Sequence, residues 1–198
     1  MMLTELTVVP GASLPVQALK DHLRLGTGFT EDGMQDGLIE SYLRAAMAAV
    51  EGRIGKVLLA RQYRLTLGDW RAAGEQPLPV APVSGIVSVT VVDAADVATL
   101  VAAGRYRLVP DMHRPKLAAV GVLLPTVPMD GRAEVVFDAG FGTTWAEVPA
   151  DLAQAVILLA AEYYEVRQAG EGREAGLPFA VQALIERWRT VRVLGGKA

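Results

Sequence analysis

Histidine and cysteine, two residue types that often carry catalysis, are rare or absent in this sequence. The histidines do not stand at a spacing that forms a known catalytic motif. The two histidines, His22 and His113, lie far apart in the chain. Neither belongs to an HExxH or Glu-x-x-His motif that could hold zinc. Cysteine is absent, which excludes disulfides, thiolate metal sites and a thiol nucleophile. We therefore expect both histidines to be structural, and the sequence predicts no metal and no cofactor.

Three carboxylates, Asp32, Asp36 and Glu40, recur at intervals of four residues. On a helix this spacing places them on one face. Paired carboxylates can perform acid–base catalysis when burial separates their pKa values, so one hypothesis is a small hydrolase that uses them with His22 or His113. No nucleophile and base stand together, however, which favours a solvated acidic face or a partner contact. We expect that the protein is not an enzyme.

A glycine pair, Gly140-Phe141-Gly142, lies between an expected strand and an expected helix. A dinucleotide-binding loop would need a third glycine where Trp145 stands, and a parallel βαβ unit around it. Neither condition is met. The pair therefore predicts a tight turn.

The C-terminal end from Arg187 to Ala198 is basic and contains no acidic residue. Such an end is often disordered in a free protein. It could also bind nucleic acid weakly and in a salt-sensitive way, as in a small nucleic-acid-binding regulator. A third interpretation is docking on a partner as an extended segment anchored by Val191, Val193 and Leu194. The residues alone leave these alternatives open.

Composition narrows the class of protein. The chain has 198 residues, of which 52% are hydrophobic, and its formal charge is 19 − 22 = −3. This balance does not favour tight nucleic-acid binding. The mean hydropathy of +0.30 indicates either an unusually apolar core or an apolar surface that meets another chain. The first 19 residues hold no Lys or Arg, unlike a signal peptide, and no uncharged apolar run reaches membrane-spanning length, so we expect a soluble intracellular chain.

Hydrophobic periodicity predicts helices on both sides of a β unit. Four helices are expected, from Pro15 to Gly26, from Thr30 to Gly52 or Gly55, from Pro149 to Gly170, and from Pro178 onward. Alternating patterns predict strands near residues 62–67, 86–92, 106–108 and 133–138, with loops or short strands across 110–128. The fold class is therefore α+β, a helical bundle with an inserted small antiparallel β unit. The expected divisions are residues 1–56, 57–147 and 148–198, all in one domain.

Short phrases spread over nearly the whole chain resemble, in the same order, the head–tail connector (head-completion adaptor) family of tailed phages, prophages and gene transfer agents. The phrases are Leu19–Leu25, Leu38–Ala46, Val50–Lys56, Pro77–Pro79, Ser84–Val89, Phe137–Gly142, Val148–Ala155, Tyr163–Arg167 and Leu177–Leu184. The tract from Pro110 to Met129 departs from the family pattern by its length and its prolines.

This resemblance implies a structural protein that forms a ring, typically of twelve copies, beneath the portal and joins the DNA-filled capsid to the tail. Its implied partners are the portal protein, a stopper or tail-completion protein and further copies of itself. DNA would pass through the lumen without specific binding, and no membrane is involved. The implied location is the head–tail joint of a virion or phage-like particle assembled in the bacterial cytoplasm.

Family analogy also places the portal contact at the C-terminal end. The residues expected to make it are Arg187, Trp188, Arg189, Val191, Arg192, Val193 and Leu194. The acidic face formed by Asp32, Asp36 and Glu40 is expected to contact the neighbouring subunit or to line the lumen.

Overall fold

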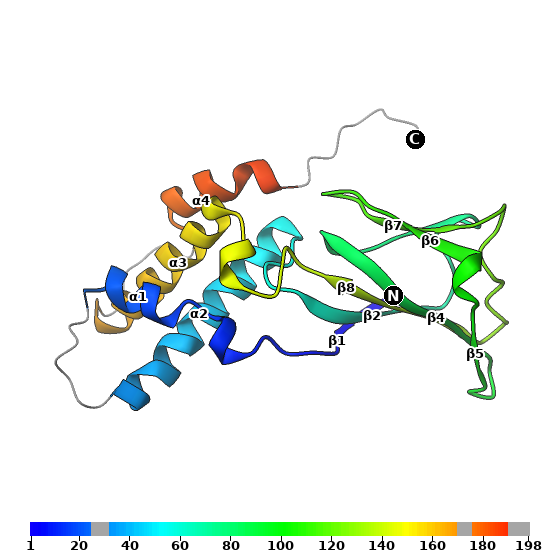
Figure 1. The fold of residues 1–198 in the computed structure, drawn as a ribbon, viewed down its shortest axis with the longest axis horizontal. Helices are drawn as coiled ribbons and strands as arrows, with labels where there is room; N and C mark the ends of the chain where they lie inside the picture. Colours follow the sequence, from blue (N-terminus) through cyan, green and yellow to red (C-terminus); the bar gives the residue numbers. More distant parts are fainter. Residues whose placement is uncertain (25–31, 170–175, 190–198) are drawn as a thin grey trace. The chain divides into compact units, whose positions relative to one another are not determined.

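The structure, a computed structural model, describes residues 1–24, 32–169 and 176–189 (Figure 1). Thr30, the expected cap of the second helix, lies outside these residues. The chain forms two compact units. We call residues Met1–Val9 with Leu59–Phe141 the sheet unit, and Pro10–Leu58 with Gly142–Ala198 the helical unit.

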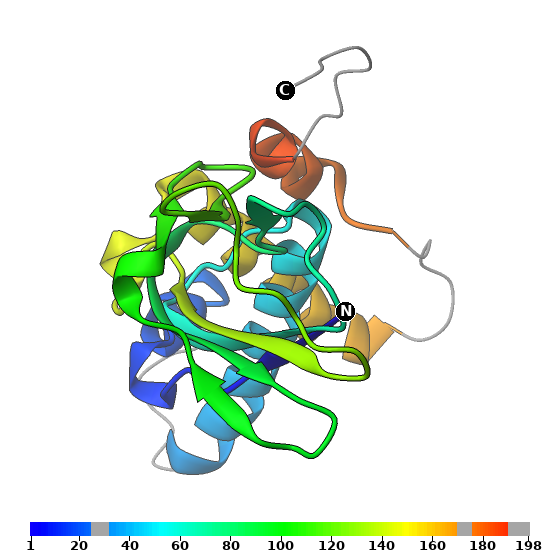
Figure 2. The same ribbon diagram turned by 90° about the vertical axis from the view of Figure 1, so that its right-hand side faces the viewer.

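The sheet unit contains two antiparallel sheets, where the alternating sequence patterns predicted a single small antiparallel β unit (Figures 1 and 2). The larger sheet has the order β1-β2-β8-β4-β5, and its strands are β1 (Met2–Glu5), β2 (Arg61–Leu67), β8 (Arg132–Ala139), β4 (Val83–Val92) and β5 (Ala98–Leu100). The smaller sheet has the order β3-β7-β6, and its strands are β3 (Glu75–Pro77), β7 (Lys116–Ala119) and β6 (Tyr106–Val109). The tract that departs from the family pattern thus supplies β7.

Alternation in β2 and β8 buries one face of the larger sheet. Leu65 lies opposite Val135, which lies opposite Val89, and all three side chains are fully buried. In the next buried row, the rings of Tyr63 and Phe137 stack with centroids 6.0 Å apart. Each such aliphatic side chain contributes about 1.5–3 kcal/mol relative to an exposed one, so these rows are a main source of stability for the sheet unit.

In β4 the simple alternation expected from the sequence is partly wrong. Val89 and Val91 are buried as expected, but Val87 is 50% exposed. The cause is a shift of register between Ile86 and Ser88, where β4 gains a residue relative to β8. A bulge of this kind changes which side chains face the core.

The sequence analysis also missed two edge strands of the larger sheet. The residues before Pro10 had been placed with the first helices, but β1 pairs with β2. Strand β5 forms a hairpin with β4 across the expected turn at residues 93–96. Both strands are too short for alternation to be recognised.

The helical unit contains α1 (Val16–His22), α2 (Asp32–Ile54), α3 (Ala150–Ala169) and α4 (Phe179–Ile185), with α2 packed on α3 and α3 on α4 (Figure 1). Its core joins large aliphatic side chains and alanines from these helices. The fully buried residues are Leu19, Ile39, Leu43, Ala46, Val50, Leu152, Ala155, Val156, Ala160 and Val181. The small alanines allow close approach of two helix backbones. At the rim, the rings of Tyr42 and Tyr164 meet edge to face.

Helix α2 ends where glycine supplies a left-handed conformation. Gly55 has φ +66° and follows the last helical residue, Ile54. Gly52, the other expected terminator, lies inside the helix, so that part of the expectation is wrong. Among the described helices, none is both long enough and apolar enough to cross a membrane.

Candidate functional site

Among the described residues, the side chains that the sequence singled out form no catalytic cluster. His22 and His113 are both exposed. Within the described residues, no three His, Asp or Glu side chains come together as a possible metal site.

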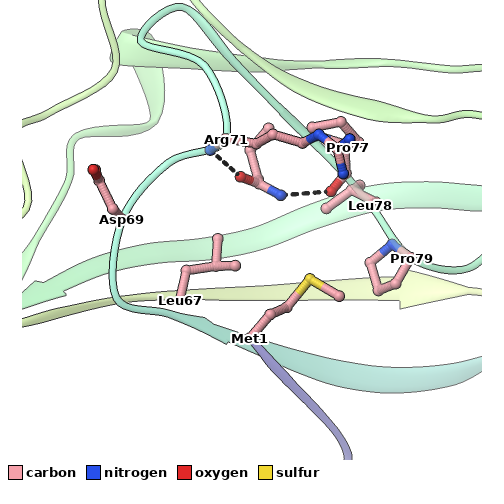
Figure 3. A pocket seen from close by; sticks show the side chains of 8 residues that line it. Met1, Leu67, Asp69, Arg71, Pro77, Leu78 and Pro79 are labelled. Atoms are coloured by element: carbon pink, nitrogen blue, oxygen red, sulfur yellow. Dashed lines mark hydrogen bonds between the residues drawn. The ribbon is translucent and has the colours of Figure 1, made fainter.

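The hollow beside the start of β1 has a volume of about 340 Å³ and is mainly apolar (Figure 3). The side chain of Gln76 closes its inner wall: its carbonyl oxygen accepts from the Arg71 backbone N–H at 2.9 Å, and its amide donates to the Pro77 carbonyl at 2.8 Å. Because Gln76 is buried and uses both ends of its amide, it fixes the loop between β2 and β3. The hollow is lined by Met1, Leu67, Asp69, Arg71, Gln76, Pro77, Leu78 and Pro79, which include no nucleophile paired with a base.

The acidic face of α2 is partly neutralised within the helical unit. Asp36 forms an ion pair with Lys20 of α1. Glu40 accepts from the guanidinium of Arg44 one turn later, at 2.6 Å. The side chain of Asp32 lies outside the described part of the structure. The geometry assigns Asp36 to holding α1 against α2, and contacts of this face with a subunit or the lumen stay a prediction.

The first glycine of the pair lies in a bend that follows β8, and the tight turn that the sequence predicted stays a prediction. Gly140 has φ +140°, and its N–H donates to the Pro82 carbonyl at 2.9 Å. The chain then reaches Thr144, whose backbone N–H and hydroxyl both donate to the Glu147 carboxylate at 2.9 Å. This capping box precedes the start of α3.

Hydrogen bonds from the Thr144 backbone N–H and then the Thr144 hydroxyl lower the pKa of Glu147 below its usual 4.5. A lowered pKa means that Glu147 stabilises the folded chain above its unfolded pKa and loses this contribution as pH falls through the folded pKa. We expect Glu147→Gln to lower the free energy of unfolding at pH 7, with a difference from wild type that shrinks in acid. Urea unfolding at a series of pH values measures this difference. Glu165→Gln, at an exposed position of α3, is the control; a Glu147 effect independent of pH would contradict the assignment.

The start of the basic C-terminal end is fastened to the first turn of α3. The indole N–H of Trp188 donates to Oδ2 of Asp151 at 2.7 Å, and Nε of Arg187 lies 2.7 Å from the same oxygen. The guanidinium of Arg187 also stacks over the Trp188 ring, 4.8 Å from its centroid. Arg189 pairs with Glu186 at 3.1 Å and has an extended backbone. Asp151 therefore fixes the point from which the chain continues.

The residues expected to contact the portal fall into two groups. Arg187, Trp188 and Arg189 make contacts within the helical unit. The others lie outside the described residues, and they are Val191, Arg192, Val193 and Leu194.

Comparison with solved structures decides the family. The chain is similar to a chain in "Neck of empty GTA particle computed with C6 symmetry", with 56% identity and a TM-score of 0.90. It is also similar to chains in "Neck of native GTA particle computed with C12 symmetry" (53% identity, TM-score 0.85) and in "Virion of native gene transfer agent (GTA) particle" (56% identity, TM-score 0.86). All three comparisons cover 100% of both chains.

The chain belongs to the head–tail connector family of gene transfer agents. No family model matches it, and no curated protein matches it. The order of short phrases in the sequence, rather than any catalytic or binding signature, was the signal that led to this family.

Proposed function

We propose that this chain is a structural connector in the neck of a gene-transfer-agent particle, where copies of it form a ring at the joint between head and tail. The observation that carries the proposal is the full-length similarity, at 53–56% identity, to chains from necks with sixfold and twelvefold symmetry. At this identity the whole fold is shared, including both units.

Ring formation agrees with the chemistry of the surface. A cyclic ring of identical copies needs two different surfaces on each copy that fit one another. Large apolar side chains are available outside the core, such as Phe179 on α4 and Val122 and Met129 in the sheet unit. Such side chains favour burial against another chain.

We further propose that the connector is not an enzyme and that DNA passes through its ring without specific binding. In the part of the chain that the structure describes, the two histidines and the acidic face form no nucleophile–base pair. The net charge of −3 supports weak rather than tight contact with DNA.

The portal protein is the proposed partner of the C-terminal end, and a stopper or tail-completion protein is the proposed partner on the tail side. A basic end without acidic residues, with apolar residues at intervals, suits binding as an extended segment. Since Asp151 already binds Arg187 and Trp188, the residues beyond Arg189 are the ones proposed to reach the portal.

Deletion of the gene in its host, followed by induction of particle production, tests the proposed function. We expect negative-stain electron microscopy to show filled or empty heads separate from free tails, because the joint lacks its connector. Expression of the wild-type gene from a plasmid should restore joined particles. Normal joined particles in the deletion strain would contradict the proposal and favour the hydrolase or nucleic-acid-binding alternatives.

A further inference from the structure

Among the residues that the structure describes, nothing pairs with the outer edges of the larger sheet of the sheet unit, so both edges are open. In the order β1-β2-β8-β4-β5, each of the outer strands is hydrogen-bonded on one side only. Every residue of β5 is exposed, and so are most residues of β1. An open edge is a template for pairing with a strand of another chain.

The hydrogen-bonding pattern identifies which backbone groups β5 directs away from its own sheet. The Val101 N–H donates to the Val89 carbonyl, and the Asp93 N–H donates to the Val97 carbonyl. In an antiparallel pair such residues alternate along the strand, so the backbone groups of Thr99 also face β4. The N–H and C=O groups of Ala98 and Leu100 therefore point toward the open edge.

The same reasoning applies to β1. The Leu6 N–H donates to the Gln62 carbonyl at 2.8 Å, so alternation directs Thr4 and Met2 toward β2 as well. The N–H and C=O groups of Leu3 and Glu5 point away from the sheet.

Proteins block such pairing with short edge strands, charges or prolines; β1 and β5 are short, with four and three residues, but they lack prolines and unpaired charges. Strand β5 contains no charge and no proline. The single charge of β1, Glu5, is bound to Arg61 of the neighbouring strand at 3.0 Å. Apolar side chains stand at both edges instead, with Leu100 69% and Met2 61% exposed.

A second feature of the β5 edge is a hollow that could receive an apolar side chain. It has a volume of about 400 Å³, and Leu100, Val101 and Pro125 lie among its lining residues. Filling it with a side chain such as Met2 of another copy would remove apolar surface from water.

The two edges also match in position and direction. One row of paired residues crosses the whole sheet and joins β1 to β5 through Met2, Thr66, Glu134, Thr90 and Leu100. Because all neighbouring strands are antiparallel, the first and fifth strands, β1 and β5, run in the same direction. Neighbouring copies in a ring are related by a rotation, so β5 of one copy can meet β1 of the next as a parallel pair.

We propose that β5 of one connector subunit pairs in parallel with β1 of the next subunit, so that the sheet units form one continuous β-belt around the ring. This inference rests on the proposed neck function, which supplies the second copy as the partner. Ala98 and Leu100 on one side, and Leu3 and Glu5 on the other, supply the backbone hydrogen bonds. Since each copy offers one β1 edge and one β5 edge, all edges are paired only when the ring is complete.

Cross-linking within assembled particles tests the pairing, and the absence of cysteine from the natural chain makes the test specific. Thr4→Cys and Leu100→Cys place thiols at two exposed positions, one on each edge. Purified particles that carry the double variant are treated with a short bismaleimide and examined by denaturing gel and immunoblot. We expect a ladder of connector multimers from the double variant, and from neither single variant.

The outcomes separate this inference from the proposed function. Joined particles that contain the double variant but give no ladder would overturn the β-belt and leave the neck function intact. Particles that lack the connector altogether in the wild-type strain would overturn both.

Two substitutions at one position test the backbone bonds directly. Ala98→Pro removes an N–H that faces the open edge, and an edge strand tolerates proline at such a position. Ala98→Val keeps the N–H and suits a strand. When each variant replaces the wild type, we expect Ala98→Pro to reduce joined particles at least tenfold and Ala98→Val to leave their number unchanged, with both purified chains retaining the wild-type circular dichroism spectrum. Equal numbers of joined particles from the two variants would contradict the pairing.

Discussion

Replacing Gly140 by alanine is expected to destabilise the sheet unit. The effect should exceed that of adding a single methyl group anywhere else in the segment that follows β8. Gly140 has φ +140°, a conformation that residues with a Cβ rarely adopt. A Cβ at this position would lie 2.5 Å from both Cα and N of Ala60, which are backbone atoms and cannot rotate away. The strain and the overlap together correspond to about 3–5 kcal/mol. Thermal unfolding followed by circular dichroism should show a midpoint about 6–20 °C lower.

Gly68, which follows β2, provides the matched control. A Cβ built there meets no atom within 4 Å, and its φ is not positive. Gly68→Ala should therefore leave the midpoint unchanged or raise it slightly, because alanine reduces the freedom of the unfolded chain. A Gly140→Ala midpoint within two degrees of the Gly68→Ala midpoint would show that the segment can relax.

Long or strongly alternating segments were predictable from the sequence, and short ones were not. The alternation in β2 and β8 specified both strands and their buried faces. Strand β5 consists of three exposed residues, and nothing in Ala98, Thr99 and Leu100 separates them from a loop until β4 is seen beside them. The exposure of Val87 likewise depends on a bulge, which a periodic pattern cannot foresee.

The contacts of the candidate sites depend on pairs that are far apart in the sequence. The basic character of the C-terminal end was visible, but its attachment required Asp151 to lie beside Trp188. The acidic face of α2 was predicted from spacing alone, whereas Lys20 reaches Asp36 only because α1 packs on α2. Sequence patterns report faces of single elements, and they do not report which elements meet.

The family could be inferred without any such contact, because the inference used the order of short sequence phrases. A structural connector has no catalytic signature that could have served instead. Each subunit of a ring must present two different surfaces that fit one another, and whole strands and helices form such surfaces. In this chain, the two edge strands β1 and β5 meet the requirement in the proposed β-belt, and the sequence had predicted neither of them. Short edge strands gain importance in a ring because each contact is repeated in every copy.

Removal of residues 190–198 is expected to abolish portal binding and to leave the fold intact. These residues contain the basic Arg192 and Lys197 and three apolar residues, Val191, Val193 and Leu194. Asp151 holds Arg187 and Trp188, so the helical unit keeps its last described contacts in the shortened chain. We expect no measurable binding of the shortened chain to the purified portal protein, a loss of more than tenfold in affinity and so of more than about 1.4 kcal/mol, with an unchanged thermal midpoint.

The composition of this end allows its two kinds of contact to be separated. Arg192→Ala with Lys197→Ala removes charge, so its effect on portal binding should be larger at low salt than at high salt. Replacing Val191, Val193 and Leu194 by serine removes apolar anchors, and its effect should depend little on salt. A chain of full length in which residues 190–198 are replaced by glycine and serine is the control for length. If this control, or the shortened chain itself, binds the portal as tightly as the wild type, then the portal contact lies elsewhere on the connector.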